Sequence, residues 1–356
     1  MKEDKQKDRV RGSLVGGAIG DALGVPVEFI YSYEDIQKRY GKEGITRLDT
    51  TQWWTESNIG KAVISDDTQM TLFTALGLLN AKEKGMAPVP AICYAYIEWL
   101  YTQKGMRSKR FNKCWIGDLP ELNVRRAPGH TCITALEKII QGCDPMNDSK
   151  GCGGIMRIAP IPLYGLSQNR ISDVEALNEL AADAAELTHE HPLGYIPAYM
   201  MSHIIFRLGT DESPTREAFH KYVLEAMQMA DKKYASQNQS IKILHALMNK
   251  ALALAHEETP EHEAIRQIGE GWVAEETLAI AVYCCAKYFD NFEKALIASV
   301  NHGGDSDSTG AVTGNILGAA IGYDAIPEHF KKDLELHDVI LHVADDLWRG
   351  YTTKFK

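Results

Sequence analysis

Two acidic groups in the sequence have the composition of a site for a hard divalent cation. In the second of them along the chain, Asp305 and Asp307 stand two residues apart with Ser308 beside them, before a run of small residues that predicts a helix. One helix N-cap needs only one carboxylate, and a second carboxylate about 4 Å away costs on the order of 4 kcal/mol at an effective dielectric near 20. The stretch 301–322 contains no Lys or Arg. A bound cation, a distant basic residue or a raised pKa must therefore relieve the repulsion.

The first acidic group along the chain has the same character. Asp66 and Asp67 are flanked by Ser65 and Thr68, they open another predicted helix, and no Lys or Arg occurs in residues 62–81. Helix capping accounts for one of the two carboxylates at most. Carboxylates and hydroxyls are ligands that suit Mg²⁺, Mn²⁺ or Ca²⁺ and not zinc. If the two helix N-termini face each other, the four carboxylates can hold two divalent ions, an arrangement that can clamp and activate oxygen atoms.

Two rows of glycines predict a pair of closely packed helices. The rows are Gly12, Gly16, Gly20 and Gly24, and Gly310, Gly314, Gly318 and Gly322. A spacing of four places each row on one helix face, where a neighbouring backbone can approach closely. Short apolar spans and the polar residues Asp21 and Asn315 favour a soluble core over a pair of membrane helices.

Apolar residues recur at helical spacing along most of the chain, and no stretch shows the alternation typical of a strand. The ranges with this spacing are 67–84, 90–102, 131–141, 172–188, 193–208, 214–230, 239–256, 274–289, 290–300 and 332–348. Residues 40–62 and 103–129 predict long loops, which in a compact domain are usually functional. We therefore expect an all-α fold, with one domain over residues 11–350 after a charged N-terminal tail at residues 1–10.

Composition narrows the class of protein further. The chain has 356 residues, 45% of them hydrophobic, and a net charge of −10, which argues against nucleic acid or an anionic membrane as the main partner. Its seven cysteines form no C-x-x-C pair, which predicts reduced thiols and no zinc site. Without an apolar run of 18 residues or the apolar core of a signal peptide, the sequence predicts a cytoplasmic protein.

Five blocks of the sequence resemble the ADP-ribosylglycohydrolase family, and they occur in the family's order over about residues 11–325. The blocks are GSLVGGAIGDALGVPVEF from Gly12, ISDDTQM from Ile64, GCGGIMRIAP from Gly151, LTHEHP from Leu187 and NHGGDSDSTG from Asn301. The resemblance implies an all-α enzyme with a binuclear metal cleft that removes ADP-ribose from modified proteins. Both divalent cations would be Mg²⁺, with Mn²⁺ as the alternative. The acceptor would be arginine, linked to ADP-ribose through an N-glycosidic bond.

The same resemblance implies roles for both acidic groups. It gives six metal ligands: Ser65, Asp66, Asp67, Asp305, Asp307 and Ser308. In such enzymes water attacks the anomeric carbon of a ribose that lies over the metals. One of the four aspartates then takes the proton of that water, and the closely placed carboxylates stabilise the charge that develops on the ribose ring.

A set of substrate-binding residues is also implied by the resemblance: Glu28, Gly151, Cys152, Gly153, Gly154, Met156, His189, Asn301, Gly303 and Gly304. Simpler interpretations stay open, since Glu28 could be a solvated loop acid, the glycines an ordinary turn and His189 a favourable charge at a helix C-terminus. The bare amides of the 151–154 turn are candidates to cradle pyrophosphate. Family members commonly carry asparagine in place of Cys152 and serine in place of Gly154, so two side-chain hydrogen bonds are missing here.

Other residues have weaker claims to the site. Arg125 and Arg126 could meet phosphate or the modified protein, although a solvated surface position is the simpler expectation. Four aromatic residues in or beside the long loops could stack on adenine, although core packing is the simpler expectation for each. These are Trp53, Trp54, Tyr101 and Trp115.

Three functions fit these residues. The first is the metal-dependent hydrolase, which reverses a regulatory or toxin-catalysed modification and has an ADP-ribosylated protein as its substrate partner. The second is a non-catalytic module that binds ADP-ribose or occludes a cognate ADP-ribosyltransferase toxin, as an immunity protein would. The third is another two-metal reaction such as phosphoester hydrolysis. Because all six candidate ligands are present, we favour the hydrolase.

Overall fold

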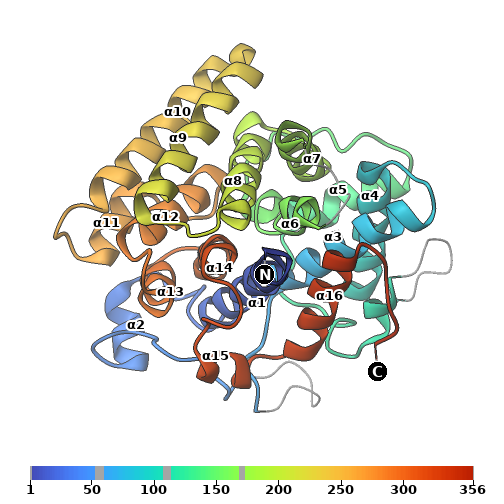
Figure 1. Ribbon diagram of the computed structural model, residues 1–356. Coiled ribbons are helices and arrows are strands. Elements are labelled where there is room, and N and C mark those ends of the chain that lie inside the picture. The colour runs from blue at the N-terminus through green and yellow to red at the C-terminus, as the bar shows by residue number, and fades with distance from the viewer. Residues whose placement is uncertain (1, 53–59, 107–113, 168–172, 356) are drawn as a thin grey trace.

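The computed structural model describes residues 2–52, 60–106, 114–167 and 173–355, and this part of the chain is helical almost throughout (Figure 1). The α-helices are α1 (Lys2–Gly24), α2 (Tyr33–Tyr40), α3 (Asp66–Glu83), α4 (Pro88–Gln103), α5 (His130–Ile140), α6 (Pro160–Leu166), α7 (Val174–Glu186), α8 (Pro192–Thr210), α9 (Arg216–Lys233), α10 (Asn238–Leu254), α11 (Glu261–Ile268), α12 (Ala274–Lys287), α13 (Phe292–Val300), α14 (Ser306–Ile321), α15 (Glu328–Asp333) and α16 (His337–Arg349). The described ranges contain no named strand, only isolated bridges that pair residues 62 with 334 and 151 with 273. The all-α prediction is confirmed.

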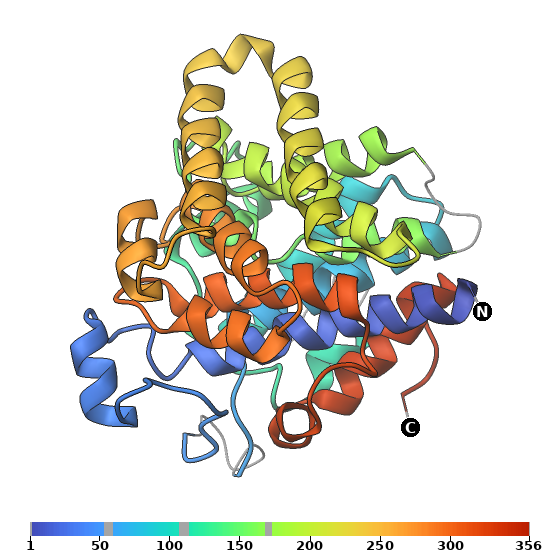
Figure 2. The same cartoon turned by 60° about the vertical axis from the view of Figure 1, so that its left-hand side comes forward.

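Helices α1 and α14 lie side by side at the centre of the molecule (Figures 1 and 2). Their glycine rows face each other as the spacing predicted. A Cβ atom added to Gly12 would lie 2.5 Å from the carbonyl oxygen of Gly318, and one added to Gly16 would lie 2.5 Å from that of Gly314. Any side chain at these positions would force the two backbones apart. The contact continues to Gly24, which packs against the backbone of Asp307, so the end of α1 meets the start of α14.

Most predicted helices are confirmed within a few residues, and two predictions were wrong in detail. The helix expected over 332–348 is divided into α15 and α16, because Leu336 has a φ of 56° and the chain turns there. The charged residues expected to form a tail begin α1 instead. Within this segment Arg9 is buried, and its Nη1 donates a hydrogen bond to the carbonyl oxygen of Leu208 at 3.1 Å.

The remaining helices surround the central pair. Helices α3 and α4 pack together on one side, and α8 and α12 contact α14 on another. Helices α9 and α10 form a hairpin that projects from the body of the molecule (Figure 2). Within the described ranges, no helix is long and apolar enough to cross a membrane.

Candidate active site

The N-termini of α3 and α14 open into one cavity of about 170 Å³. The glycine contact between α1 and α14 brings the second acidic group to this point, and α3 packs beside α1. Five carboxylates line the cavity together with small, aromatic and histidine residues. The lining consists of Glu28, Asp66, Asp67, Ala127, Gly129, His130, Thr131, Cys132, Gly151, Cys152, Gly153, Met156, His189, Trp272, Asp305, Asp307 and Ser308. The two acidic groups, 240 residues apart, therefore form a single site.

The first acidic group is fixed by helix capping. Ser65 is the N-cap of α3, and its Oγ accepts a hydrogen bond from the backbone N–H of Asp67 at 3.1 Å. The carboxylate of Asp66 accepts one from the N–H of Gly129 at 3.2 Å. The Oδ1 atom of Asp67 is buried and has no hydrogen-bond partner among the described residues. A buried carboxylate oxygen of this kind needs a partner, and Asp67 lines the same cavity as the other carboxylates.

Asp21 supports this group from the last turn of α1, and sequence reasoning missed that role. Its carboxylate is completely buried and accepts hydrogen bonds from the backbone N–H groups of Ser65 at 3.0 Å and Thr68 at 3.1 Å. The hydroxyl of Thr68 donates to it as well. Burial, and next the charge of Asp307, raise the pKa of Asp21 to about 7. The sequence did contain a signal for this role: Asp21 lies among the glycines of the first row, and a charged residue inside a core helix needs hydrogen-bond partners.

The second acidic group begins α14. Asp305 is the N-cap and accepts a hydrogen bond from the N–H of Ser308 at 3.3 Å, while Asp307 accepts from the same N–H at 2.9 Å. The preceding glycine loop is held by His302, whose Nδ1 accepts from the N–H of Gly304 at 3.2 Å. Burial lowers the pKa of His302 to about 4. His302 is therefore neutral and structural, and does not neutralise the acidic group.

Four of the expected substrate-binding residues do not line the cavity. Asn301 accepts a hydrogen bond from the N–H of Ile45 and donates one to its carbonyl oxygen, both at 2.8 Å, and so ties down the loop after α2. The other three are glycines that pack against main chain: Gly303 against Tyr31, Gly304 against Glu270, and Gly154 against Gly194. They shape the backbone around the site.

Glu28 does line the cavity, and it joins the second acidic group. One carboxylate oxygen from each of Glu28, Asp305 and Asp307 lies within 4.8 Å of the others. Burial, and next the charges of Asp307 and Asp305, raise the pKa of Glu28 to about 11. Burial and mutual repulsion also raise the pKa values of Asp66, Asp67 and Asp305 well above the ordinary range for aspartate. Among the described lining residues none is Lys or Arg, so the donor set fits a divalent cation.

His189 faces the glycine turn. A Cβ atom on Gly151 would lie 3.3 Å from its Nε2, and one on Gly153 would lie 3.0 Å from its Cε1. A side chain at either glycine would therefore crowd the imidazole ring. Two of the amides expected to cradle pyrophosphate already have partners, since the N–H of Gly151 donates to Ser149 Oγ at 3.3 Å and that of Cys152 to the carbonyl oxygen of Trp272 at 3.2 Å.

The buried side chain of Arg157 orients His189 through Thr188. The Nη2 of Arg157 donates a hydrogen bond to Thr188 Oγ1 at 2.7 Å, and the same oxygen forms a 2.8 Å hydrogen bond with His189 Nδ1. The guanidinium lies over the ring of Tyr96, 4.1 Å from its centroid. Burial, and next the charge of Arg157, lower the pKa of His189 to about 3. The ring is therefore neutral at physiological pH and presents Nε2 toward the cavity.

Cys152 occupies a 3₁₀ turn, η3 (Cys152–Gly154), beside the second acidic group. Burial, and next the negative charge of Asp305, raise the pKa of its thiol well above the usual value. The residue that departs from the family pattern therefore lies in the same cavity as the acidic group.

The long loop predicted at 103–129 contributes to the site. It supplies Ala127 and Gly129, and the first turn of α5 adds His130, Thr131 and Cys132. None of these five was selected from the sequence. Their only signal was the length of the loop itself.

The weaker candidates lie elsewhere. Trp115 stacks on Phe355, with 5.4 Å between ring centroids, and Tyr101 packs against the hydrophobic core, so the core expectation is confirmed for both. Trp53 and Trp54 lie outside the described residues. Arg125 is exposed as expected, but Arg126 is completely buried, so its assignment to the surface was wrong.

Known proteins resemble this chain over nearly its whole length. A family model described as ADP-ribosylglycohydrolase matches residues 2–355. The ADP-ribosyl-[dinitrogen reductase] glycohydrolase of Rhodospirillum rubrum is 27% identical over 92% of this chain and 91% of its own. The ADP-ribosylarginine hydrolase Tri1 of Serratia proteamaculans is 24% identical over 98% of this chain and 81% of its own. The human ADP-ribosylhydrolase ARH3 is 26% identical over 57% of this chain and 59% of its own.

A solved structure shares the fold. A chain described as an ADP-ribosylglycohydrolase-related protein complex matches with a TM-score of 0.65 and 24% identity. The match covers 98% of this chain and 99% of the solved one. At this identity the likeness shows the all-α architecture alone.

Proposed function

The chain belongs to the ADP-ribosylglycohydrolase family, and we propose that it is a cytoplasmic, cation-dependent hydrolase that removes ADP-ribose from modified arginine side chains. Residues 11–350 would form the catalytic domain. The observation that carries this proposal is the meeting of both acidic groups and Glu28 in one cavity whose described lining has no Lys or Arg.

Two Mg²⁺ ions fit the donor set, with Mn²⁺ as the second choice. Ser65, Asp66 and Asp67 would hold cations from the start of α3, and Asp305, Asp307 and Ser308 from the start of α14. The unpartnered Oδ1 of Asp67 supports this assignment, since it is an anionic oxygen without a donor. When bound, the cations would supply Lewis acidity that polarises ribose hydroxyls and lowers the pKa of water.

The side chains that line the cavity have three further roles in the proposed reaction. One of the four aspartates accepts the proton of the attacking water, because all four aspartate carboxylates line the cavity and a carboxylate can act as a general base. The other carboxylates stabilise the positive charge that develops on the ribose ring. The neutral imidazole of His189 cannot supply a proton at physiological pH, and it orients the substrate through Nε2.

One comparison supports arginine as the acceptor. A relative that aligns with 98% of this chain is named as an ADP-ribosylarginine hydrolase. The substrate partner would be an ADP-ribosylated protein, and an ADP-ribosyltransferase that makes this modification is the proposed cognate toxin.

Mass spectrometry of a protein carrying arginine-linked ADP-ribose tests the proposal. We expect release of intact ADP-ribose by the wild type with Mg²⁺, and none after EDTA treatment or with Asp305→Ala. Release of AMP or phosphate would indicate a different two-metal reaction. If nothing is released although ADP-ribose binds tightly, serine-linked ADP-ribose is tested next, and a second negative result would favour a non-catalytic protein that occludes a partner.

A further inference from the structure

We propose that the buried ion pair between Arg126 and Glu335 positions the cation-binding residues at the start of α3. Neither residue lines the cavity, so both are positioning residues. The inference rests on the proposed function in one respect, namely that the α3 group binds a divalent cation. The test below separates the two.

The ion pair is completely enclosed and bidentate. The side chain of Arg126 is 0% exposed and that of Glu335 is 3% exposed. Nη1 donates to Oε2 at 2.9 Å, and Nη2 donates to Oε1 at 2.7 Å. Two parallel hydrogen bonds between planar groups fix their relative orientation as well as their distance.

Both members of the pair form hydrogen bonds with the main chain of Ile64. Arg126 Nη1 donates to the carbonyl oxygen of Ile64 at 3.0 Å, and the N–H of Ile64 donates to Glu335 Oε2 at 3.1 Å. The N–H of Asp66 donates to the carbonyl oxygen of Arg126 at 3.1 Å. Residues 64 and 66 flank the N-cap Ser65, so the pair holds the main chain on both sides of the first proposed ligand.

A short β-bridge extends the same link. The N–H of Ala62 donates to the carbonyl oxygen of Asp333 at 2.8 Å, and the N–H of Glu335 donates to that of Ala62 at 3.0 Å. The chain that leads into α3 is thereby joined to the segment between α15 and α16. Because residues 62 and 335 are far apart in sequence, tertiary contacts and not local propensity set the position of the α3 N-terminus.

Backbone strain occurs at both ends of the pair. Ala127 has a φ of 50° and Leu336 a φ of 56°, and each directly follows one member of the pair. In the described part of the chain, Met146 is the one other non-glycine residue with positive φ. Strained residues persist where the surrounding structure over-determines them, and they cluster at functional sites. Ala127 itself lines the cavity, so the strain reaches the site.

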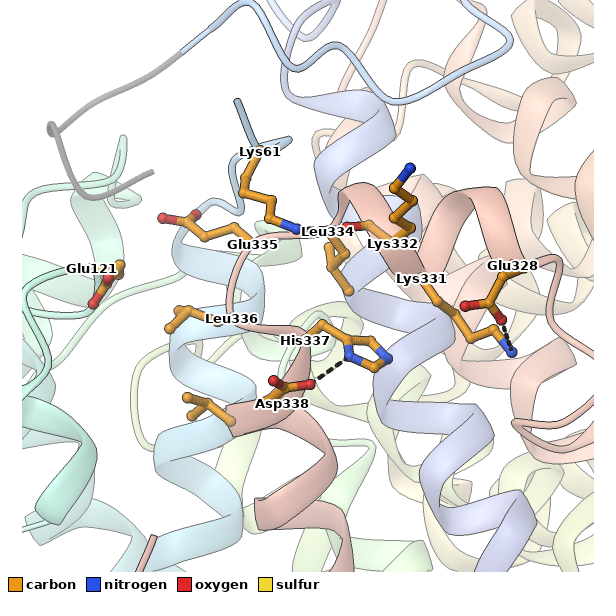
Figure 3. A pocket seen from close by; sticks show the side chains of 11 residues that line it. Lys61, Glu121, Glu328, Lys331, Lys332, Leu334, Glu335, Leu336, His337 and Asp338 are labelled. Carbon is orange, nitrogen blue, oxygen red and sulfur yellow. Dashed lines mark hydrogen bonds and ion pairs between the residues drawn. The ribbon is translucent and has the colours of Figure 1, made fainter. Parts of the chain in front are cut away.

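A nearby carboxylate provides a matched control. Glu335 and Asp338 both line a second cavity of about 440 Å³, which shares no lining residue with the active-site cavity (Figure 3). Asp338 pairs with His337 Nδ1 at 3.0 Å and is 87% exposed. Glu335→Gln and Asp338→Asn each remove one negative charge at the same cavity and keep the side-chain shape. Only the first reaches Ile64 and Arg126.

The experiment is calorimetric titration with Mn²⁺, together with electron paramagnetic resonance of the bound ion. We expect Glu335→Gln and Arg126→Met to weaken Mn²⁺ binding about tenfold or more and to change the spectrum, as for other groups that orient metal ligands. Asp338→Asn should stay within about twofold of the wild type, since it leaves the α3 segment untouched. An unchanged Mn²⁺ affinity and spectrum in a folded Glu335→Gln protein, whatever its melting temperature, would show a merely structural pair and overturn the inference.

If the single variants do not fold, the double variant Arg126→Met with Glu335→Leu replaces the pair by apolar side chains. Wild-type Mn²⁺ affinity in that protein would overturn the inference, and weakened affinity would support it. If the wild type binds no Mn²⁺ at all, the proposed cation site fails and the inference fails with it. If the wild type binds Mn²⁺ and the variants bind it equally well, only the inference fails.

Discussion

The carboxylate of Asp21 accepts a hydrogen bond from the backbone N–H of Ser65 at 3.0 Å, so the central helix α1 holds the first residue of the α3 acidic group. The same carboxylate accepts from the N–H of Thr68 at 3.1 Å. The site is therefore assembled from three helices. Asp305 and Asp307 lie at the start of α14, Asp66 and Asp67 lie at the start of α3, and α1 holds the start of α3 in place through Asp21.

We expect Asp21→Asn to cost about 1–3 kcal/mol in the free energy of unfolding, because the amide replaces one acceptor oxygen by an NH₂ group, which would face the N–H of Ser65 or the donors of Thr68. Loss of the fixed geometry should also lower kcat about tenfold or more. Urea denaturation and steady-state kinetics check both effects. Asp345→Asn, at a partly exposed ion pair with Arg11, is the control and should retain full kcat. A fully active Asp21→Asn protein would contradict this role.

The acidic cavity should make stability depend on pH in the absence of cations. The pKa values of its carboxyl groups Asp66 and Asp305 are raised in the folded state, and the pKa of the neighbouring Asp21 is raised to about 7. The folded protein therefore binds more protons than the unfolded chain, and stability is lost as the pH rises through these values. In EDTA we expect a higher melting temperature at pH 5.5 than at pH 8.

Addition of Mg²⁺ should reverse that trend. Cations and protons compete for the same oxygens, so stabilisation by Mg²⁺ should be larger at pH 8 than at pH 5.5. Differential scanning fluorimetry at both pH values measures the shift in melting temperature that Mg²⁺ causes. An equal shift at both pH values, or an equal shift in Asp305→Ala, would place the bound ion outside this cavity.

The contact between α1 and α14 should tolerate no side chain. We expect Gly16→Ala to destabilise the protein by about 1–3 kcal/mol, because the new Cβ would lie 2.5 Å from the carbonyl oxygen of Gly314. Gly117→Ala is the control, since its Cβ would lie 3.6 Å from the nearest atom, an ordinary contact. Thermal unfolding of both variants checks the difference. Equal melting temperatures would mean that the helices can separate without cost.

Thr188→Val should weaken substrate binding without affecting the cations. The change keeps the side-chain shape but removes the oxygen that joins Arg157 to His189, so the imidazole loses its orientation. One such hydrogen bond is worth about 0.5–1.5 kcal/mol, which corresponds to roughly 2–10-fold in the Kd for ADP-ribose. Calorimetry with ADP-ribose and separately with Mn²⁺ checks this. A changed Mn²⁺ affinity would contradict the assignment of this residue to His189 alone.

Local patterns in the sequence predicted the elements of this site. The pairs Asp66–Asp67 and Asp305–Asp307 were found because each is a short sequence signal that helix capping cannot explain. The packing of α1 on α14 was found because a spacing of four is visible within one helix. Such features depend on neighbouring residues only, and the structure places them as expected.

Long-range contacts were out of reach. Arg126 was assigned to the surface, because nothing near it in sequence indicates that Glu335 lies beside it. Asp21 was noted only as a polar residue in an apolar span, because its hydrogen-bond partners lie 44 and 47 residues away in the sequence. Asn301 was grouped with the site by its position next to the glycines, but its side chain binds Ile45, and only the three-dimensional structure shows this.

The glycine rows have a consequence for how this protein can change over evolution. Where two helices touch through their main chains, the distance between them does not depend on the size of any side chain. Substitutions in the outer helices can then accumulate and be repacked without shifting α1 against α14. The spacing between the two acidic groups is thus insulated from sequence drift elsewhere, and only a change at the glycines themselves can alter it.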